Sequence, residues 1–268
     1  MSDARLRALE RRYRRSGCLE DHVRYLRSAL RASALSAERL GLAAALGHPA
    51  ARAVLGADAP PLLEALLDDP LPRALGPLSP AGDEALSAWA QALAGWGQRV
   101  AVGGAVAAAE AVLPRWTWEH PSAARPWPAS AGAPPDARPA LALEAARGWL
   151  HDPGPARARA AARAAEAVRE VLEGTFYAWA MDAAMACAQA ALLAALGDGG
   201  DPASPLAFCL RCARDAESAW RRQEAARAGR RPLLASVGRR NAEAWLRNRV
   251  ASALVAWALD EPPPGEAA

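Results

Sequence analysis

The stretch AWAMDAAMACAQAALLAAL, residues 178–196, decides the fold class of this chain. Alanine, which has the highest helix propensity, recurs through it without proline, glycine or a β-branched residue. Alanine also makes up about a quarter of the 268 residues, well above ordinary usage. No part of the chain alternates apolar and polar residues over the length of a strand. The sequence therefore predicts an all-α protein.

The composition is typical of a globular chain, with 52% hydrophobic and 23% charged residues. All 32 basic residues are arginine, and the formal net charge is +3. The charge is uneven: residues 1–31 hold nine arginines and four acids (9 − 4 = +5), and residues 211–249 hold eleven and four (11 − 4 = +7). Both segments are suited to attract an acidic partner.

No uncharged run approaches the length of a bilayer-spanning helix. The basic start, residues 1–15, lacks the apolar core of a secretory signal. We therefore expect a cytoplasmic protein with no membrane partner.

The four cysteines are too few to form a disulfide framework in a chain of this length. Cys209 and Cys212 are three residues apart, and Cys187 lies in the preceding helical segment. We expect these three to be small buried thiols, with a metal site or a redox pair as alternatives.

Helix-stop signals divide the chain into two helical parts and a short tail. Short amphipathic segments at residues 1–76 predict a small N-terminal subdomain, in which Ser36 caps a helix and Pro49 opens the next. Residues 77–260 predict a larger helical bundle, which includes an irregular loop rich in proline and tryptophan at 114–139. Residues 261–268 are expected to be frayed.

One long helix is expected over residues 80–113, with Gly103-Gly104 marking either a break or a close helix crossing. Core packing is the expected role of six tryptophans in helical segments, namely Trp89, Trp96, Trp149, Trp179, Trp245 and Trp257.

Three tryptophans lie in the irregular loop, namely Trp116, Trp118 and Trp127. Tryptophan is enriched in binding hot spots, so these residues are candidate anchors for a protein partner. Arg221 and Arg222 are candidates for steering an acidic partner towards the chain. Elsewhere the arginine doublets are typical of a solvated helix face, and no nucleic-acid-reading motif is present. We therefore do not expect nucleic acid as the main partner, and a nucleic-acid-associated helical protein remains an alternative.

The order His120, His151-Asp152, Asp182 resembles that of the HD phosphohydrolases, all-helical enzymes in which such residues hold metal ions. That resemblance implies metal-activated hydrolysis of a phosphoester as an alternative function. Templates such as the Walker loop, HExxH and GxSxG are absent from the sequence. Our main interpretation therefore has no catalytic residue, metal or cofactor.

Three motifs carry a second resemblance: AAEAVLP at residues 108–114, DARP at 136–139 and EAARGW at 144–149. Together with the alanine-rich helices around them, over residues 86–259, they resemble an alanine-rich helical family of immunity proteins from bacterial polymorphic-toxin systems. The loop at 115–138 is longer and richer in tryptophan than in that family. The resemblance implies a non-enzymatic protein that binds and neutralises a toxin, with an acidic toxin surface as the expected target.

Overall fold

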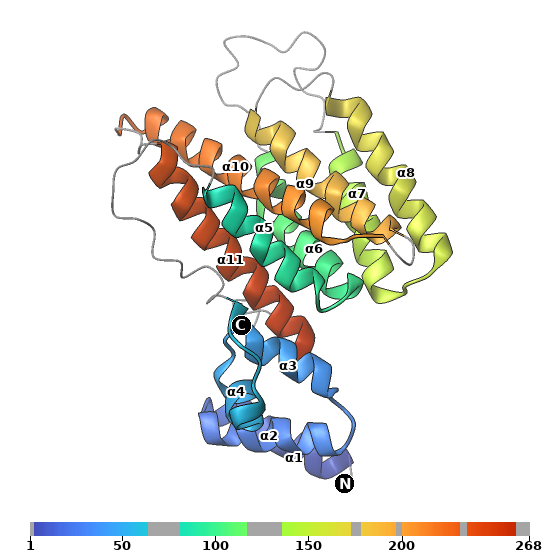
Figure 1. Cartoon of the computed structure of the whole chain (residues 1–268), viewed down its shortest axis with the longest axis vertical. Helices are drawn as coiled ribbons and strands as arrows, with labels where there is room; N and C mark the ends of the chain where they lie inside the picture. The colour runs from blue at the N-terminus through green and yellow to red at the C-terminus, as the bar shows by residue number, and fades with distance from the viewer. Residues whose placement is uncertain are drawn as a thin grey trace. The chain divides into compact units, whose positions relative to one another are not determined.

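The structure, a computed structural model, describes residues 3–63, 81–116, 136–172, 178–196, 200–230 and 235–260. Every regular element in these ranges is helical, which confirms the all-α prediction (Figure 1). The chain divides into two compact units, the first comprising Met1–Leu75 with Ala251–Ala268 and the second Gly76–Val250.

Over residues 3–58 the first unit forms four α-helices and a short 3-10 turn. Their bounds are α1 Asp3–Ser16, α2 Leu19–Arg31, α3 Ala37–Ala45, α4 Pro49–Leu55 and η1 Gly56–Asp58. The second unit is built from longer helices. Their bounds are α5 Ala81–Ala94, α6 Gln98–Trp116, α7 Arg138–His151, α8 Pro155–Leu172, α9 Ala178–Ala195, α10 Ala203–Arg227 and α11 Ala235–Leu259, whose last residues belong to the first unit.

Local sequence signals determine several helix ends of the first unit. The Ser36 hydroxyl accepts a hydrogen bond of 3.2 Å from the backbone N–H of Arg39 and so caps α3, as predicted. His48 Nδ1 accepts one of 3.2 Å from Ala51 N–H at the start of α4. Pro49 occupies the first turn of α4, also as predicted.

The end of α11 packs into the first unit through Trp257. Arg39 donates a hydrogen bond to the Trp257 carbonyl, and its guanidinium lies 5.2 Å from the Trp257 ring. Helix α11 thus continues past Val250, where the second unit ends, and Ala251 and the residues after it belong to the first unit.

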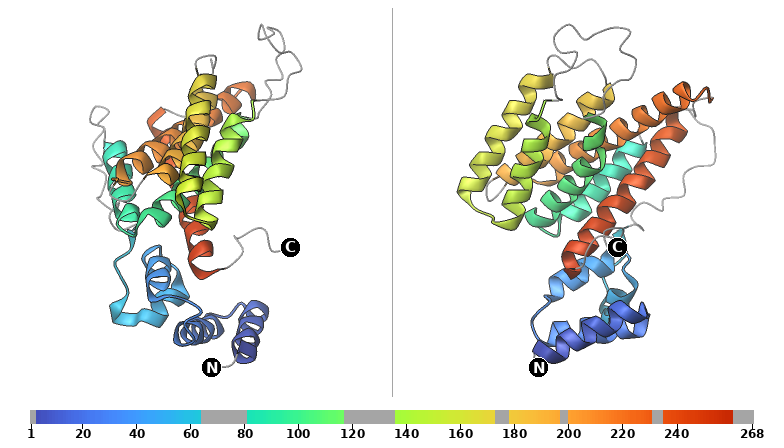
Figure 2. Two further views of the ribbon diagram at one scale, coloured as in Figure 1. Left: turned by 90° about the vertical axis from the view of Figure 1, so that its right-hand side faces the viewer. Right: turned by 180° about the vertical axis from the view of Figure 1, so that it is seen from behind.

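In the second unit α9 lies among α6, α7, α8 and α10 (Figures 1 and 2). By length and composition α9 is apolar enough to span a membrane, and half of its residues are buried inside the unit. Small side chains fill this core. They include Ala105, Ala183, Ala186, Ala190 and Ala213.

The predicted helical stretch over residues 80–113 is interrupted, but not at Gly103-Gly104. The chain forms α5 and α6, separated at Gly97, whose φ of +99° glycine adopts without strain. Gly104 lies inside α6, where an added Cβ would be 3.6 Å from Val250, an ordinary contact distance. The conformational freedom of glycine therefore breaks the helix at Gly97, whereas the helix continues through Gly104.

Candidate functional site

A buried carboxylate joins two helices of the second unit. The side chain of Glu217 on α10 is only 3% exposed and accepts hydrogen bonds from two arginines. Arg115 at the end of α6 donates from Nε and Nη2, at 3.1 and 2.9 Å, to one carboxylate oxygen. Arg221 donates from Nε to the other oxygen at 2.6 Å. The three groups together carry one excess positive charge (+2 − 1 = +1).

Two tryptophan rings hold these guanidinium groups in place. The Arg115 guanidinium lies 4.9 Å from the ring centre of Trp220, and that of Arg221 lies 5.6 Å from Trp245. Arg249 on α11 also contacts Trp245, at 6.0 Å. Cation–π contacts of this kind restrict the arginine rotamers. Trp245 is half-buried and Arg249 is exposed, so the outer part of this arrangement faces solvent.

We call Arg221, Arg222, Trp245 and Arg249 the Arg–Trp surface. Arg222 is exposed and follows Arg221 on α10. Glu217 neutralises only one of the two charges of Arg115 and Arg221. The Arg–Trp surface, together with Arg115 and Glu217 beneath it, therefore keeps a positive charge. Guanidinium groups bind carboxylates through paired hydrogen bonds, so this chemistry suits an acidic partner.

The structure describes one of the three predicted tryptophan anchors. Trp116 is half-buried at the end of α6, and its indole N–H donates a hydrogen bond of 2.7 Å to the Asp136 carbonyl. Trp118 and Trp127 lie outside the described residues. Arg221, predicted to steer a partner, is 44% exposed and already engaged with Glu217, so its charge is partly neutralised within the fold.

A second group of buried charges surrounds Arg214, whose side chain is 3% exposed. It pairs with Asp83 at 2.6 Å and Asp215 at 3.1 Å, and Glu243 lies 4.0 Å away. Arg239 also pairs with Asp215, and Arg247 with Glu243. These pairs connect α5, α10 and α11 and compensate a charge that would otherwise be costly to bury.

Asp182 on α9 lies near this group and was part of the predicted metal constellation. Burial, the largest cause, and the charge of Asp215 raise the pKa of Asp182 to about 6, against the lowering effect of Arg214 and Arg239. Burial likewise raises the pKa of Glu243. Burial and the negative charge of Asp215 thus favour the protonated form of Asp182.

The other members of the metal constellation lie elsewhere or are not described. His151 and Asp152 are exposed at the end of α7. Within the described ranges no three His, Cys, Asp or Glu side chains are placed to hold a metal ion, so His151, Asp152 and Asp182 do not form such a group. His120 lies outside the described residues.

The three helical cysteines are buried thiols, as expected. Burial raises the pKa of Cys187 and of Cys212 to about 12 and also raises that of Cys209. The Cys209 thiol donates to the carbonyls of Ala105 and Ala186, at 3.6 and 3.4 Å. These thiols are poor nucleophiles because the thiolate is the reactive form.

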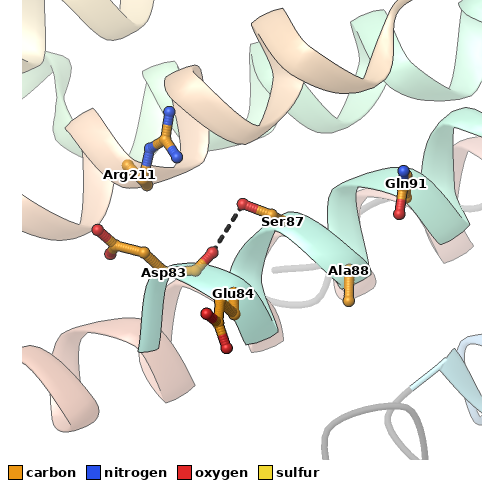
Figure 3. A pocket seen from close by; sticks show the side chains of 6 residues that line it. All are labelled: Asp83, Glu84, Ser87, Ala88, Gln91 and Arg211. Atoms are coloured by element: carbon orange, nitrogen blue, oxygen red, sulfur yellow. Dashed lines mark hydrogen bonds between the residues drawn. The ribbon is translucent and has the colours of Figure 1, made fainter. Parts of the chain in front are cut away.

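A shallow hollow of about 340 Å³ lies between α5 and α10 (Figure 3). Its lining residues are Asp83, Glu84, Ser87, Ala88, Gln91 and Arg211. Arg211 also lies 5.7 Å from the ring of Phe208, which is 37% exposed. Asp83, which lines the hollow, also pairs with the buried Arg214. The hollow therefore adjoins the group of charges around Arg214.

Sequence reasoning missed Glu217 and Arg249 and assigned Trp245 to the core. Trp89 and Trp149 are buried as predicted, but Trp245 is half-buried between two arginines. The spacing of Trp245 and Arg249, four residues apart on one helix, is the signal that could have indicated their contact. No family model, curated protein or solved structure matches this chain.

Proposed function

We propose that this chain is a non-enzymatic protein-binding module that occludes an acidic surface of its partner, as a cytoplasmic immunity protein occludes a toxin. One observation carries the proposal: Arg115 and Arg221 share a single carboxylate, while Arg222 and Arg249 remain exposed. The Arg–Trp surface therefore combines an excess of positive charge with the two residue types most enriched in binding hot spots.

Two arginines of this surface, Arg221 and Arg249, contact Trp245 before a partner arrives. The buried Glu217 fixes Arg221, and the Trp245 ring lies between Arg221 and Arg249. Prior ordering reduces the conformational entropy lost on association, so more of the contact energy contributes to affinity. The exposed charges accelerate encounter with an acidic partner. Trp116, Trp118 and Trp127 remain the predicted apolar anchors of the same interaction.

The test begins with a tagged full-length chain purified from its native host, with mass spectrometry and elemental analysis of the eluate. We expect a stoichiometric partner encoded by a neighbouring gene. A partner-free protein carrying a stoichiometric transition metal would contradict the proposal and favour the phosphohydrolase alternative.

Charge-reversal variants then locate the binding surface. R222E/R249E is expected to weaken partner binding more than tenfold, mainly through slower association. The matched control R159E/R163E changes two exposed arginines of α8 and should bind within twofold of the wild type. Equal losses in both variants would show that net charge, rather than the Arg–Trp surface, determines binding. Trp118→Ala is expected to weaken binding and to leave the melting temperature nearly unchanged.

A further inference from the structure

The first unit carries another basic surface, which does not depend on the proposed function. Helix α1 holds six arginines in 14 residues, and all six are exposed. They are Arg5, Arg7, Arg11, Arg12, Arg14 and Arg15. Its larger apolar side chains, Leu6, Leu9 and Tyr13, are only half-buried. Apolar burial of α1 therefore does not explain this density of like charges, which repel one another along a helix.

Ring stacking fixes the orientation of α1 on α2. Tyr13 stacks on His22 at 4.1 Å and on Tyr25 at 5.3 Å between ring centres. At 100° per residue, Arg11 and Arg15 lie about 150–170° around α1 from the centre of the stripe that contains Tyr13. The apolar stripe therefore faces α2, while these two arginines point away from it.

Two further exposed arginines, one on each helix, meet where α1 contacts α2. Arg12 and Arg24 share the carboxylate of Asp21, at 3.0 and 3.5 Å. Among the described residues no carboxylate pairs with Arg11 or Arg15, which follow each other at about 6 Å along the helix axis. We call Arg11, Arg12, Arg15 and Arg24 the α1 basic face. With Asp21 its charge is +3 (4 − 1).

We infer that the α1 basic face binds the phosphodiester backbone of nucleic acid. Guanidinium groups pair with phosphate oxygens through two parallel hydrogen bonds. Arg11 and Arg15 lie one helical turn apart on one face of α1, so both can contact the phosphates of one strand. The arginine doublets were predicted to form solvated faces; in the structure Arg11, Arg12 and Arg15 are exposed on α1, and Arg12 shares Asp21 with Arg24 of α2.

The apolar residues of α1 argue against two other anionic partners. A membrane-surface helix inserts large apolar side chains into the lipid, but here Leu6, Leu9 and Tyr13 face α2. A protein interface needs an apolar core within its polar rim. The outer side of α1 offers only Ala4 and Ala8 between its arginines. A phosphate backbone requires charge without such a core.

Fluorescence anisotropy of the full-length chain with labelled 20-base-pair DNA duplexes tests this inference. With four phosphate contacts, affinity should fall about a hundredfold between 50 and 200 mM salt, equally for two unrelated sequences. R11Q/R15Q should reduce the slope of log affinity against log salt by about half. The control R159Q/R163Q, on α8 of the second unit, should keep the wild-type slope.

Three results would overturn the inference. One is no binding at 50 mM salt, and another is an equal loss of slope in R11Q/R15Q and the control. The third is retention of the chain by vesicles of anionic phospholipid without binding to the duplex. Circular dichroism of each variant separates loss of contact from loss of fold. Because the partner assay uses the Arg–Trp surface, failure here leaves the proposed function untouched.

Discussion

Replacing Asp182 by asparagine should stabilise the second unit at neutral pH but not at acidic pH. The folded chain holds the Asp182 proton more tightly than the unfolded chain, since the pKa rises from 3.8 to about 6 on folding. The stability that this proton contributes is complete below about pH 4 and is lost as the pH rises to about 6. Above that pH the wild type contains an unfavourable ionised carboxylate, which Asp182→Asn removes.

The size of the effect follows from the pKa difference. At about 1.4 kcal/mol per pH unit, the interval corresponds to about 3 kcal/mol. Asp182 is partly exposed, and solvent screening reduces this figure to about 1.5 kcal/mol. For a unit of this size we expect a rise in melting temperature of about 3–5 °C at pH 7.5.

Urea unfolding followed by tryptophan fluorescence measures the change, because nine of the ten tryptophans lie in the second unit. The control Asp152→Asn alters a carboxylate that is 74% exposed and should change stability by less than about 0.5 kcal/mol at either pH. A gain in Asp182→Asn of equal size at pH 4 and pH 7.5 would refute the reasoning, and so would no gain at pH 7.5.

Three further tests examine the buried charges, the helix packing and the buried thiols. Glu217→Gln leaves Arg115 and Arg221 without their shared charge and should cost about 3 kcal/mol in urea unfolding, whereas Glu166→Gln on the exposed side of α8 should cost less than about 0.5 kcal/mol. Gly104→Ala adds a Cβ at ordinary contact distances, so the free energy of unfolding should rise by about 0.5–1 kcal/mol. Gly104→Leu should lower it by about 1–3 kcal/mol through overpacking. A loss of stability in the alanine variant would contradict the contact distances around Gly104. A thiol reagent at pH 8 should modify one cysteine of the folded chain, Cys18, and four after unfolding; rapid modification of Cys209 in the folded chain would show that its burial is incomplete.

Helix class and most helix ends could be predicted from the sequence because they depend on neighbouring residues. Ser36 caps a helix through an N–H three residues away, and Pro49 acts within its own turn. Gly97 was missed because glycine at 95, 97, 103 and 104 offers several possible breaks. Only the structure shows that the helix continues through Gly103 and Gly104.

The Arg–Trp surface was only partly predictable for the same physical reason. Arg115 and Glu217 are 102 residues apart, and nothing local to either residue specifies their pairing. Alanine-rich helices add little information about register, since alanine fits equally well on several faces. The sequence thus indicated that Arg221 and Arg222 could attract an acidic partner, but not that Glu217 and Arg115 hold Arg221 in place.

The alanine core has a consequence for the heat capacity of unfolding. Alanine exposes a single methyl group when a helix separates from its neighbours, so a core of Ala105, Ala183 and similar residues hides less apolar surface than one of leucine and phenylalanine. Newly hydrated apolar surface is the source of the positive heat-capacity change of unfolding. For this chain the heat-capacity change should therefore fall below the usual value of about 12–15 cal/mol/K per residue. A smaller value flattens the curve of free energy against temperature, so that cooling and warming alter the stability of this chain less than that of an ordinary globular protein.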